Sequence, residues 1–138
     1  MLIRSYLLLV LLLPLGALAQ CRSDGPESFA TFIETFGRDK AFAVTRTEYP
    51  LTSLRYSPAD NEKGSDVVTT RIGRADDAAA PPLGAIARAD GLQLSTSSLT
   101  ANTATVRMEK PDTDWLLTYH FVRNGLCWYL QRVEDHSL

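Results

Sequence analysis

The apolar residues of the chain form three different patterns, and the first lies at its start. An unbroken apolar run covers residues 6–13, after the charged Arg4 and before segment 17–19, which reads Ala-Leu-Ala. This order of charge, apolar run and small residues is typical of a secretory signal peptide. The run is also shorter than the roughly 20 apolar residues that cross a bilayer. We therefore expect residues 1–19 to be a signal peptide and residues 20–138 to be a single exported domain.

The second pattern is a stripe of four apolar residues with the spacing of one helix face. They are Phe29, Phe32, Ile33 and Phe36. Asp24 is expected to cap the start of this helix, Glu27 to complete a capping box, and Gly37 to end it. A shorter helix is expected over residues 39–44. Burial stabilises each phenylalanine by roughly 1.5–3 kcal/mol, so the stripe predicts a helix packed in the core rather than a ligand site.

The third pattern consists of β-branched and alternating apolar residues, which favour strands. Six strands are expected, over residues 51–56, 66–73, 92–95, 104–109, 115–123 and 126–133. The last two are joined by Asn124-Gly125, the signature of a two-residue type I′ turn. Residues 74–91 leave two alternatives open, short helices or an extended linker.

The predicted turn divides the C-terminal hairpin into two faces and places His120 opposite Tyr129. The drier face is expected to pack against the helices and carries Leu117, Tyr119, Phe121, Trp128 and Leu130. The mixed face carries Leu116, Thr118, His120, Val122, Cys127, Tyr129, Gln131 and Val133. Three environments remain open for the mixed face: solvent, the lining of a cleft, or contact with a partner.

Charge and motifs exclude several classes of function. The formal net charge is −2 and the basic residues form no run, so the electrostatic footprint of a nucleic-acid-binding protein is missing. The chain has no H-E-x-x-H motif, no paired C-x-x-C motifs and no glycine-rich phosphate loop. It also lacks the G-x-S-x-G nucleophile motif. We therefore expect neither a metal nor a cofactor.

Few residues remain as candidates for chemistry or binding. His120 beside Tyr129 is a weak candidate pair for proton transfer, since histidine is the commonest general acid or base. His136 lies in the acidic C-terminal tail and is expected to be a surface residue. Arg46 and Glu48 point to the same side of an extended segment and are expected to form a rim or surface pair. The expected ligand or partner face therefore consists of Thr118, His120, Tyr129, Gln131, Arg46 and Glu48.

The chain has two cysteines, Cys21 and Cys127, and the sequence allows three chemical states for them. In an oxidising compartment they form a disulfide, the state that we favour. In the second state, segment 18–21 is a lipoprotein signal and acylated Cys21 anchors the protein to a membrane, although Gln20 stands where a small residue is expected. In the third state both cysteines are free thiols. The expected location is periplasmic or secreted, with lipoprotein anchoring at Cys21 as the alternative.

The segments ESFATFIETFGRDKAFAVTRTEYPL and YHFVRNGLCWYLQRVED resemble a family of small exported bacterial domains of unknown function. That family belongs to the superfamily named for nuclear transport factor two. The motif residues are mainly folding residues: Phe32, Phe36, Asp39, Phe42, the segment 46–51, Phe121, Asn124-Gly125 and the segment 128–130. The resemblance implies an α+β fold in which N-terminal helices pack in the concave face of a curved antiparallel sheet. The resulting cone has an interior that can hold a ligand.

Enzymes of this superfamily place acidic or histidine bases in the cone, and no aspartate of this chain maps onto such a base with a matching motif. We therefore expect a non-catalytic exported cell-envelope protein that binds a small ligand or a protein partner. One alternative is a periplasmic toxin-neutralising immunity protein. Another is a small hydrolase or isomerase that uses His120 with Tyr129. A homodimer through the sheet face also remains open.

Overall fold

One six-stranded sheet organises the described part of the chain. A computed structural model describes residue 21 and residues 24–58, 65–74 and 83–137. The strands are β1 (Thr47–Pro58), β2 (Ser65–Ile72), β3 (Gln93–Leu99), β4 (Thr103–Glu109), β5 (Leu116–Asn124) and β6 (Cys127–Asp135). Their order is β2-β1-β6-β5-β4-β3, and all neighbours are antiparallel except β1 and β6. The sheet is therefore mixed, whereas a purely antiparallel sheet was expected.

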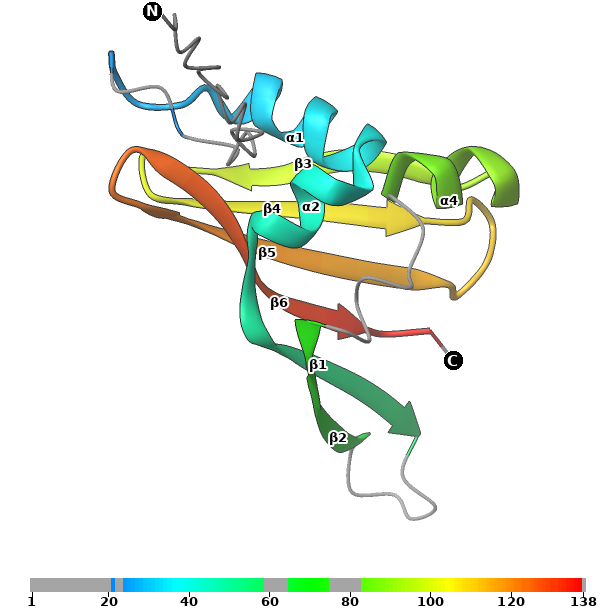
Figure 1. The fold of residues 1–138 in the computed structure, drawn as a ribbon. Helices are drawn as coiled ribbons and strands as arrows, with labels where there is room; N and C mark the ends of the chain where they lie inside the picture. Colours follow the sequence, from blue (N-terminus) through cyan, green and yellow to red (C-terminus); the bar gives the residue numbers. More distant parts are fainter. Residues whose placement is uncertain (1–20, 22–23, 59–64, 75–82, 138) are drawn as a thin grey trace, which may run out of the picture.

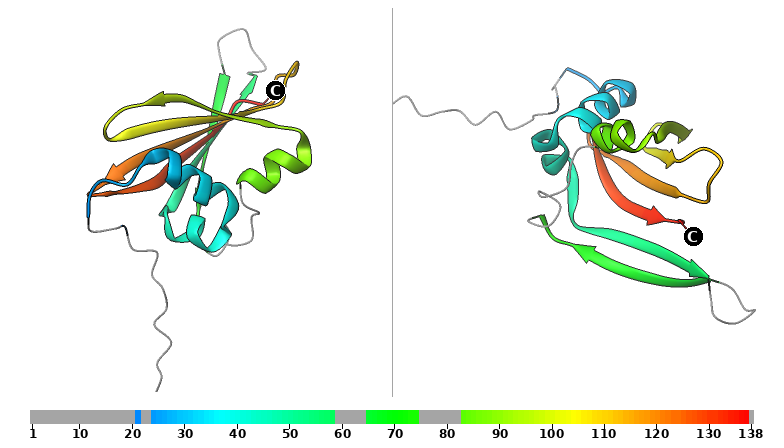
Figure 2. Two further views of the ribbon diagram at one scale, coloured as in Figure 1. Left: turned by 90° about the horizontal axis from the view of Figure 1, so that it is seen from above. Right: turned by 90° about the vertical axis from the view of Figure 1, so that its right-hand side faces the viewer.

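Three helices in the described residues lie on one side of this sheet (Figure 1). They are α1 (Phe29–Arg38), α2 (Lys40–Thr45) and α4 (Leu83–Asp90). Figure 2 shows the long β1–β2 hairpin curving away from the helices, so that the helices occupy the concave side. The predicted α+β fold is confirmed. None of the helices in this part of the chain is long and apolar enough to cross a membrane.

Two strands differ in length from the sequence prediction, and one helix decides between the alternatives left open. Strand β3 runs to Leu99 and β1 to Pro58, so both strands are longer than expected. Within residues 74–91, the helical alternative is correct for α4. Residues 75–82, like the predicted signal peptide 1–19, lie outside the described residues.

Helix α1 begins later than the sequence pattern predicts. Its N-cap is Ser28 rather than Asp24, and no side chain caps it. Glu27 does not complete a capping box, because its carboxylate accepts hydrogen bonds from the Arg46 side chain and the Trp128 backbone N–H. A residue predicted to act locally therefore makes contacts with distant parts of the chain.

Gly37 lies inside α1 instead of ending it. The helix ends before Asp39, whose side chain accepts a hydrogen bond from the Phe42 N–H at 3.0 Å and so caps α2. Gly37 faces Gly84 of α4, and a Cβ added to Gly84 would lie 2.7 Å from the Gly37 carbonyl oxygen. The absence of a side chain at Gly84 therefore allows the two helices to approach closely.

The aromatic stripe on α1 packs against the dry face of the β5–β6 hairpin, as predicted. Phe29, Phe32 and Phe36 are 5%, 1% and 3% exposed. The ring of Phe121 contacts all three at centroid separations of 5.6, 5.6 and 5.3 Å. Phe29 also packs edge-on against Trp128, at 5.0 Å. The centre of the core thus joins α1 to the middle of the sheet.

The β5–β6 hairpin has a different turn from the predicted one. The loop residues are Gly125 and Leu126, because Asn124 pairs with Cys127. Gly125 has φ +65°, whereas Leu126 is not among the residues with positive φ. A type I′ turn needs positive φ at both loop positions, so the turn fits type II′, which has glycine at the first. The observed pairing of β5 with β6 differs from the predicted pairing by two residues. Because side chains alternate with a period of two, those near the turn stay on their predicted faces.

A bulge at Gln131 changes the second half of β6. The residue before Gln131 pairs with Phe121 and the residue after it pairs with His120, so Gln131 has no partner on β5. One extra residue moves later side chains to the opposite face. Val133, predicted on the mixed face, therefore lies opposite Tyr119 and packs against the core.

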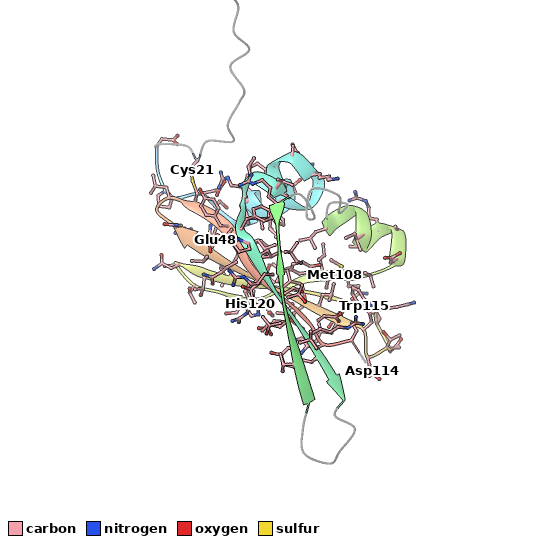
Figure 3. All side chains as sticks on the ribbon, turned by 60° about the horizontal axis from the view of Figure 1, so that its bottom comes forward. Cys21, Glu48, Met108, Asp114, Trp115 and His120 are labelled. Atoms are coloured by element: carbon pink, nitrogen blue, oxygen red, sulfur yellow. A yellow bond between two sulfur atoms is a disulfide. The ribbon has the colours of Figure 1, made fainter. Side chains whose placement is uncertain are left out.

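A disulfide joins Cys21 to Cys127, with the two Cα atoms 5.5 Å apart. Figure 3 shows Cys21 at one end of the molecule, far from Trp115 and Asp114 at the other end. The disulfide spans 106 residues of sequence and fixes the segment before α1 to the first residue of β6. Of the three states left open by the sequence, the structure therefore contains the disulfide.

Candidate ligand-binding pocket

A pocket of about 190 Å³ lies between the helices and the concave face of the sheet. Its apolar wall includes Phe36, Ile72, Leu83, Ile86, Leu130 and Val133. These residues belong to α1, β2, α4 and β6, so the pocket forms only when distant segments meet. Val133 reaches it because the bulge in β6 turns this side chain to the core side.

Helix α2 and strand β1 supply the remaining wall by their ordinary periodicities. Lys40, Ala43 and Val44 are three and four residues apart on α2, which places them on one helix face, and all three line the pocket. Leu51 and Ser53 alternate along β1 and reach the pocket from the other side. Short-range patterns in the sequence thus position both sides of the wall.

Four polar side chains interrupt the apolar lining: Lys40, Thr47, Ser53 and Tyr119. The Thr47 hydroxyl donates a hydrogen bond to the Ala43 carbonyl at 2.8 Å and so joins β1 to α2. Tyr119 is 8% exposed. Among the described contacts, neither the Lys40 ammonium nor the Ser53 hydroxyl has a hydrogen-bond or ion-pair partner. These two groups are available to a ligand.

A buried ion pair between Glu27 and Arg46 holds the start of β1 beside β6. Arg46 Nη1 lies 3.0 Å from Glu27 Oε2, and Nη2 lies 3.3 Å from Oε1. Nη1 also donates to the Trp128 carbonyl at 3.2 Å, and the Trp128 N–H donates to Glu27 Oε2 at 3.0 Å. The side chain of Arg46 is 3% exposed and that of Glu27 is 20% exposed. The structure thus pairs Arg46 with Glu27, whereas a surface pair with Glu48 was predicted.

Two aromatic rings complete the surroundings of the buried guanidinium. The Cζ atom of Arg46 lies 5.0 Å from the centroid of Phe42 and 5.5 Å from that of Tyr129. Thr47, the next residue, lines the pocket. Neither Arg46 nor Glu27 lines the pocket, so the ion pair lies behind its wall. Sequence reasoning missed Glu27 because its partners lie 19 and 101 residues away, where no local periodicity relates them.

His120 belongs to a cluster around the carboxylate of Glu134. His120 Nε2 lies 3.2 Å from Glu134 Oε1, and Arg132 Nε lies 2.9 Å from the same oxygen. His136 Nε2 shares a hydrogen bond with Glu134 Oε2 at 3.1 Å. The ring of His136 is half-buried and stacks on Tyr56 at 4.4 Å. The predicted contact of His120 with Tyr129 is absent from the strand register, because His120 lies opposite Arg132.

The residues predicted to form one ligand or partner face do not share a pocket. Tyr119 lines the pocket, so Thr118 and His120, its neighbours on β5, project from the opposite face of the sheet. Tyr129 packs on the buried guanidinium, Gln131 is exposed at the bulge, and Glu48 is half-buried on β1. A role for this face stays a prediction. Within the described residues, no group of three or more His, Cys, Asp or Glu side chains could hold a metal ion.

Comparison with known proteins bears on the fold. No protein-family model and no curated protein matches the chain. Among solved structures, an NTF2-like protein (nuclear transport factor two-like) from Bacteroides fragilis has a TM-score of 0.60 and 18% sequence identity over 85% of this chain. The chain spans half the length of that protein.

Two further solved structures are similar at lower scores. An NTF2-like protein of unknown function from Pseudomonas putida has a TM-score of 0.36 and 12% identity, over 75% of this chain and 77% of that one. A domain of unknown function with a cystatin-like fold from Nostoc punctiforme has a TM-score of 0.36 and 14% identity, over 79% of this chain and 72% of that one. With the sheet and helices described above, the Bacteroides similarity shows that the chain has the nuclear transport factor two-like fold.

Proposed function

We propose that this protein is an exported, non-catalytic binding protein whose concave pocket holds a small, mostly apolar ligand. The pocket itself is the observation that carries the proposal. Its volume of about 190 Å³ is somewhat larger than the roughly 150 Å³ of an engineered apolar cavity that binds benzene. Binding sites for small molecules are typically concave and apolar with a few polar groups, as this pocket is.

We do not extend the proposal to catalysis. The described lining of the pocket contains no histidine, aspartate, glutamate or cysteine. His120 does have a carboxylate nearby in Glu134, but both lie on the face of the sheet that the pocket does not reach. A general base must come within hydrogen-bond reach of the substrate. His120 does not line this pocket, so it would not reach a ligand bound there.

A paired substitution in α2 tests the pocket. Ala43→Phe places a ring in the pocket, whereas Ala41→Phe adds the same ring to an exposed position of the same helix. In NMR titrations with toluene and indole, we expect shifts at Ile86 and Leu130 in the wild type and in Ala41→Phe. We expect none in Ala43→Phe. Absence of binding to the wild type, or equal binding to both variants, would overturn the proposal.

Export is the second part of the proposal and has its own test. The signal-peptide pattern of residues 1–19 supports it, and so does the disulfide, since disulfides persist in oxidising compartments. After expression of the full chain in a bacterial host, the periplasmic fraction should contain a protein that starts at Gln20. Its intact mass should rise by two hydrogens on reduction. Retention of residues 1–19, or an acyl group on Cys21, would contradict this part.

A further inference from the structure

Lys40 differs from the other pocket residues in charge. It is the only charged residue in the described lining, and no described carboxylate faces it there. It lies on the pocket face of α2 with Ala43 and Val44, and it is half-buried. A lysine in this position covers apolar surface with its methylene groups and keeps its ammonium at the polar edge.

Lys40 also lacks the partners that neighbouring cations have. Arg38 pairs with Glu34 at 3.2 Å, and Arg46 pairs with Glu27 at 3.0 Å. Among the described residues, the Lys40 ammonium has no such partner. An ammonium at the edge of an apolar pocket attracts a negative charge more strongly than one in open water, because less solvent screens it.

The second polar group that a ligand can reach is the Ser53 hydroxyl on β1, which also has no described hydrogen-bond partner. A hydroxyl donates one hydrogen bond and accepts others, so it can bind a carboxylate oxygen as readily as a neutral group. A single cation with hydroxyl groups balances one negative charge. The lining therefore fits a monoanion better than a doubly charged phosphate or a cation.

From these observations we infer that the ligand of the pocket is a small monocarboxylic acid, with its carboxylate at Lys40 and its apolar body against Ile86, Leu130 and Val133. The inference rests on the proposed function and specifies its ligand class. The body of the ligand is the size of one aromatic ring or a short alkyl chain, as the volume of about 190 Å³ allows.

Benzoate and benzamide provide the test, because they have nearly the same shape and differ in charge. A charge-assisted hydrogen bond contributes roughly 1.5–3 kcal/mol, so we expect the wild type to bind benzoate about ten-fold or more tightly than benzamide in calorimetric titrations. The preference should weaken as salt is added. Hexanoate and hexanamide should show the same difference.

The variants Lys40→Met and Lys40→Gln should bind benzamide as the wild type does and lose the preference for benzoate. Lys110→Met is the matched control, since Lys110 is exposed at the far end of the sheet and does not line this pocket, and it should keep the preference. Equal affinities for benzoate and benzamide in the wild type would overturn the inference and leave the proposed pocket intact. So would a preference that survives in both Lys40 variants. Absence of binding by either compound, with no binding of toluene, would overturn both.

Discussion

The two faces of the sheet bring together different kinds of side chains. The concave face encloses a pocket with apolar walls and one charged residue, Lys40. The opposite face carries Glu134, whose carboxylate lies within 3.2 Å of His120, Arg132 and His136. His120, which looks chemically active in the sequence, thus lies on the face of the sheet away from this apolar pocket. The space for a ligand is formed by residues that look like ordinary core.

Truncation of the core beneath the concave face should have the largest effect. Trp128 has no exposed surface, and its indole Nε1–H donates to the Glu27 carbonyl at 3.0 Å. We expect Trp128→Ala to lower the free energy of unfolding by about 3–5 kcal/mol, measured by chemical denaturation. An unchanged midpoint would mean that the dry face of the hairpin does not pack on α1.

Loss of the buried ion pair should have the next largest effect. Glu27→Ala leaves the guanidinium of Arg46 buried without its carboxylate. Removal of one partner of a fully buried pair costs about 3–5 kcal/mol, and we expect about 2–4 kcal/mol here because Glu27 is partly exposed.

Glu34→Ala is the matched control for Glu27→Ala. It removes an ion pair with Arg38 in which both side chains are more than 60% exposed. Such pairs contribute at most about 1 kcal/mol, so its denaturation midpoint should stay close to that of the wild type. Similar losses in the two variants would show that burial does not distinguish the two pairs.

The close contact between α1 and α4 should give an intermediate effect. Gly84→Ala places a Cβ 2.7 Å from the Gly37 carbonyl oxygen, so the helix backbones must separate. We expect a loss of about 1–3 kcal/mol, typical of overpacking. In contrast, a Cβ on Gly37 meets its nearest atom at 3.5 Å, so Gly37→Ala should be neutral or stabilising. A reversed order in thermal melts would contradict the observed packing of the two helices.

Substitution on the opposite face should have the smallest effect. His120→Ala removes a partner of Glu134 whose side chain is 26% exposed, and it should change the free energy of unfolding by about 1 kcal/mol or less. It should also leave the affinity for toluene unchanged in the NMR titration. A large loss of affinity would show that the two faces are coupled, and turnover of a general esterase substrate that disappears in this variant would restore the enzymatic alternative.

Local periodicity explains why the elements were predictable from the sequence. The spacing of Phe29, Phe32 and Phe36 depends only on helix geometry, and the alternation of Tyr119 and Phe121 depends only on strand geometry. Both patterns identified core faces that the structure confirms. The family resemblance gave the cone-shaped fold for the same reason, since its motif consists mainly of such folding residues.

The pocket and the two charge clusters could not be predicted in the same way. Val133 reaches the pocket because of a bulge at Gln131, and nothing in the residue types around the bulge marks it. The spacing of Glu27 fits a local capping pattern and predicts a local role, but its partners are distant in sequence. Glu134 joins His120 to His136 only in the observed register. Each of these features depends on contacts between residues that are distant in sequence. Composition and local spacing do not specify such contacts.

The position of β6 in the sheet makes completion of the fold depend on contacts between residues far apart in sequence. Among the described strands β6 comes last in sequence, yet it lies between β1 and β5, so in the strand order it joins the β1–β2 hairpin to the β3–β5 meander. Its first residue, Cys127, also holds the disulfide, and its second, Trp128, meets Glu27. Contacts between residues far apart in sequence form late and slowly. Pairing of β6 with β1 and β5 is therefore expected to complete the six-stranded sheet late in folding.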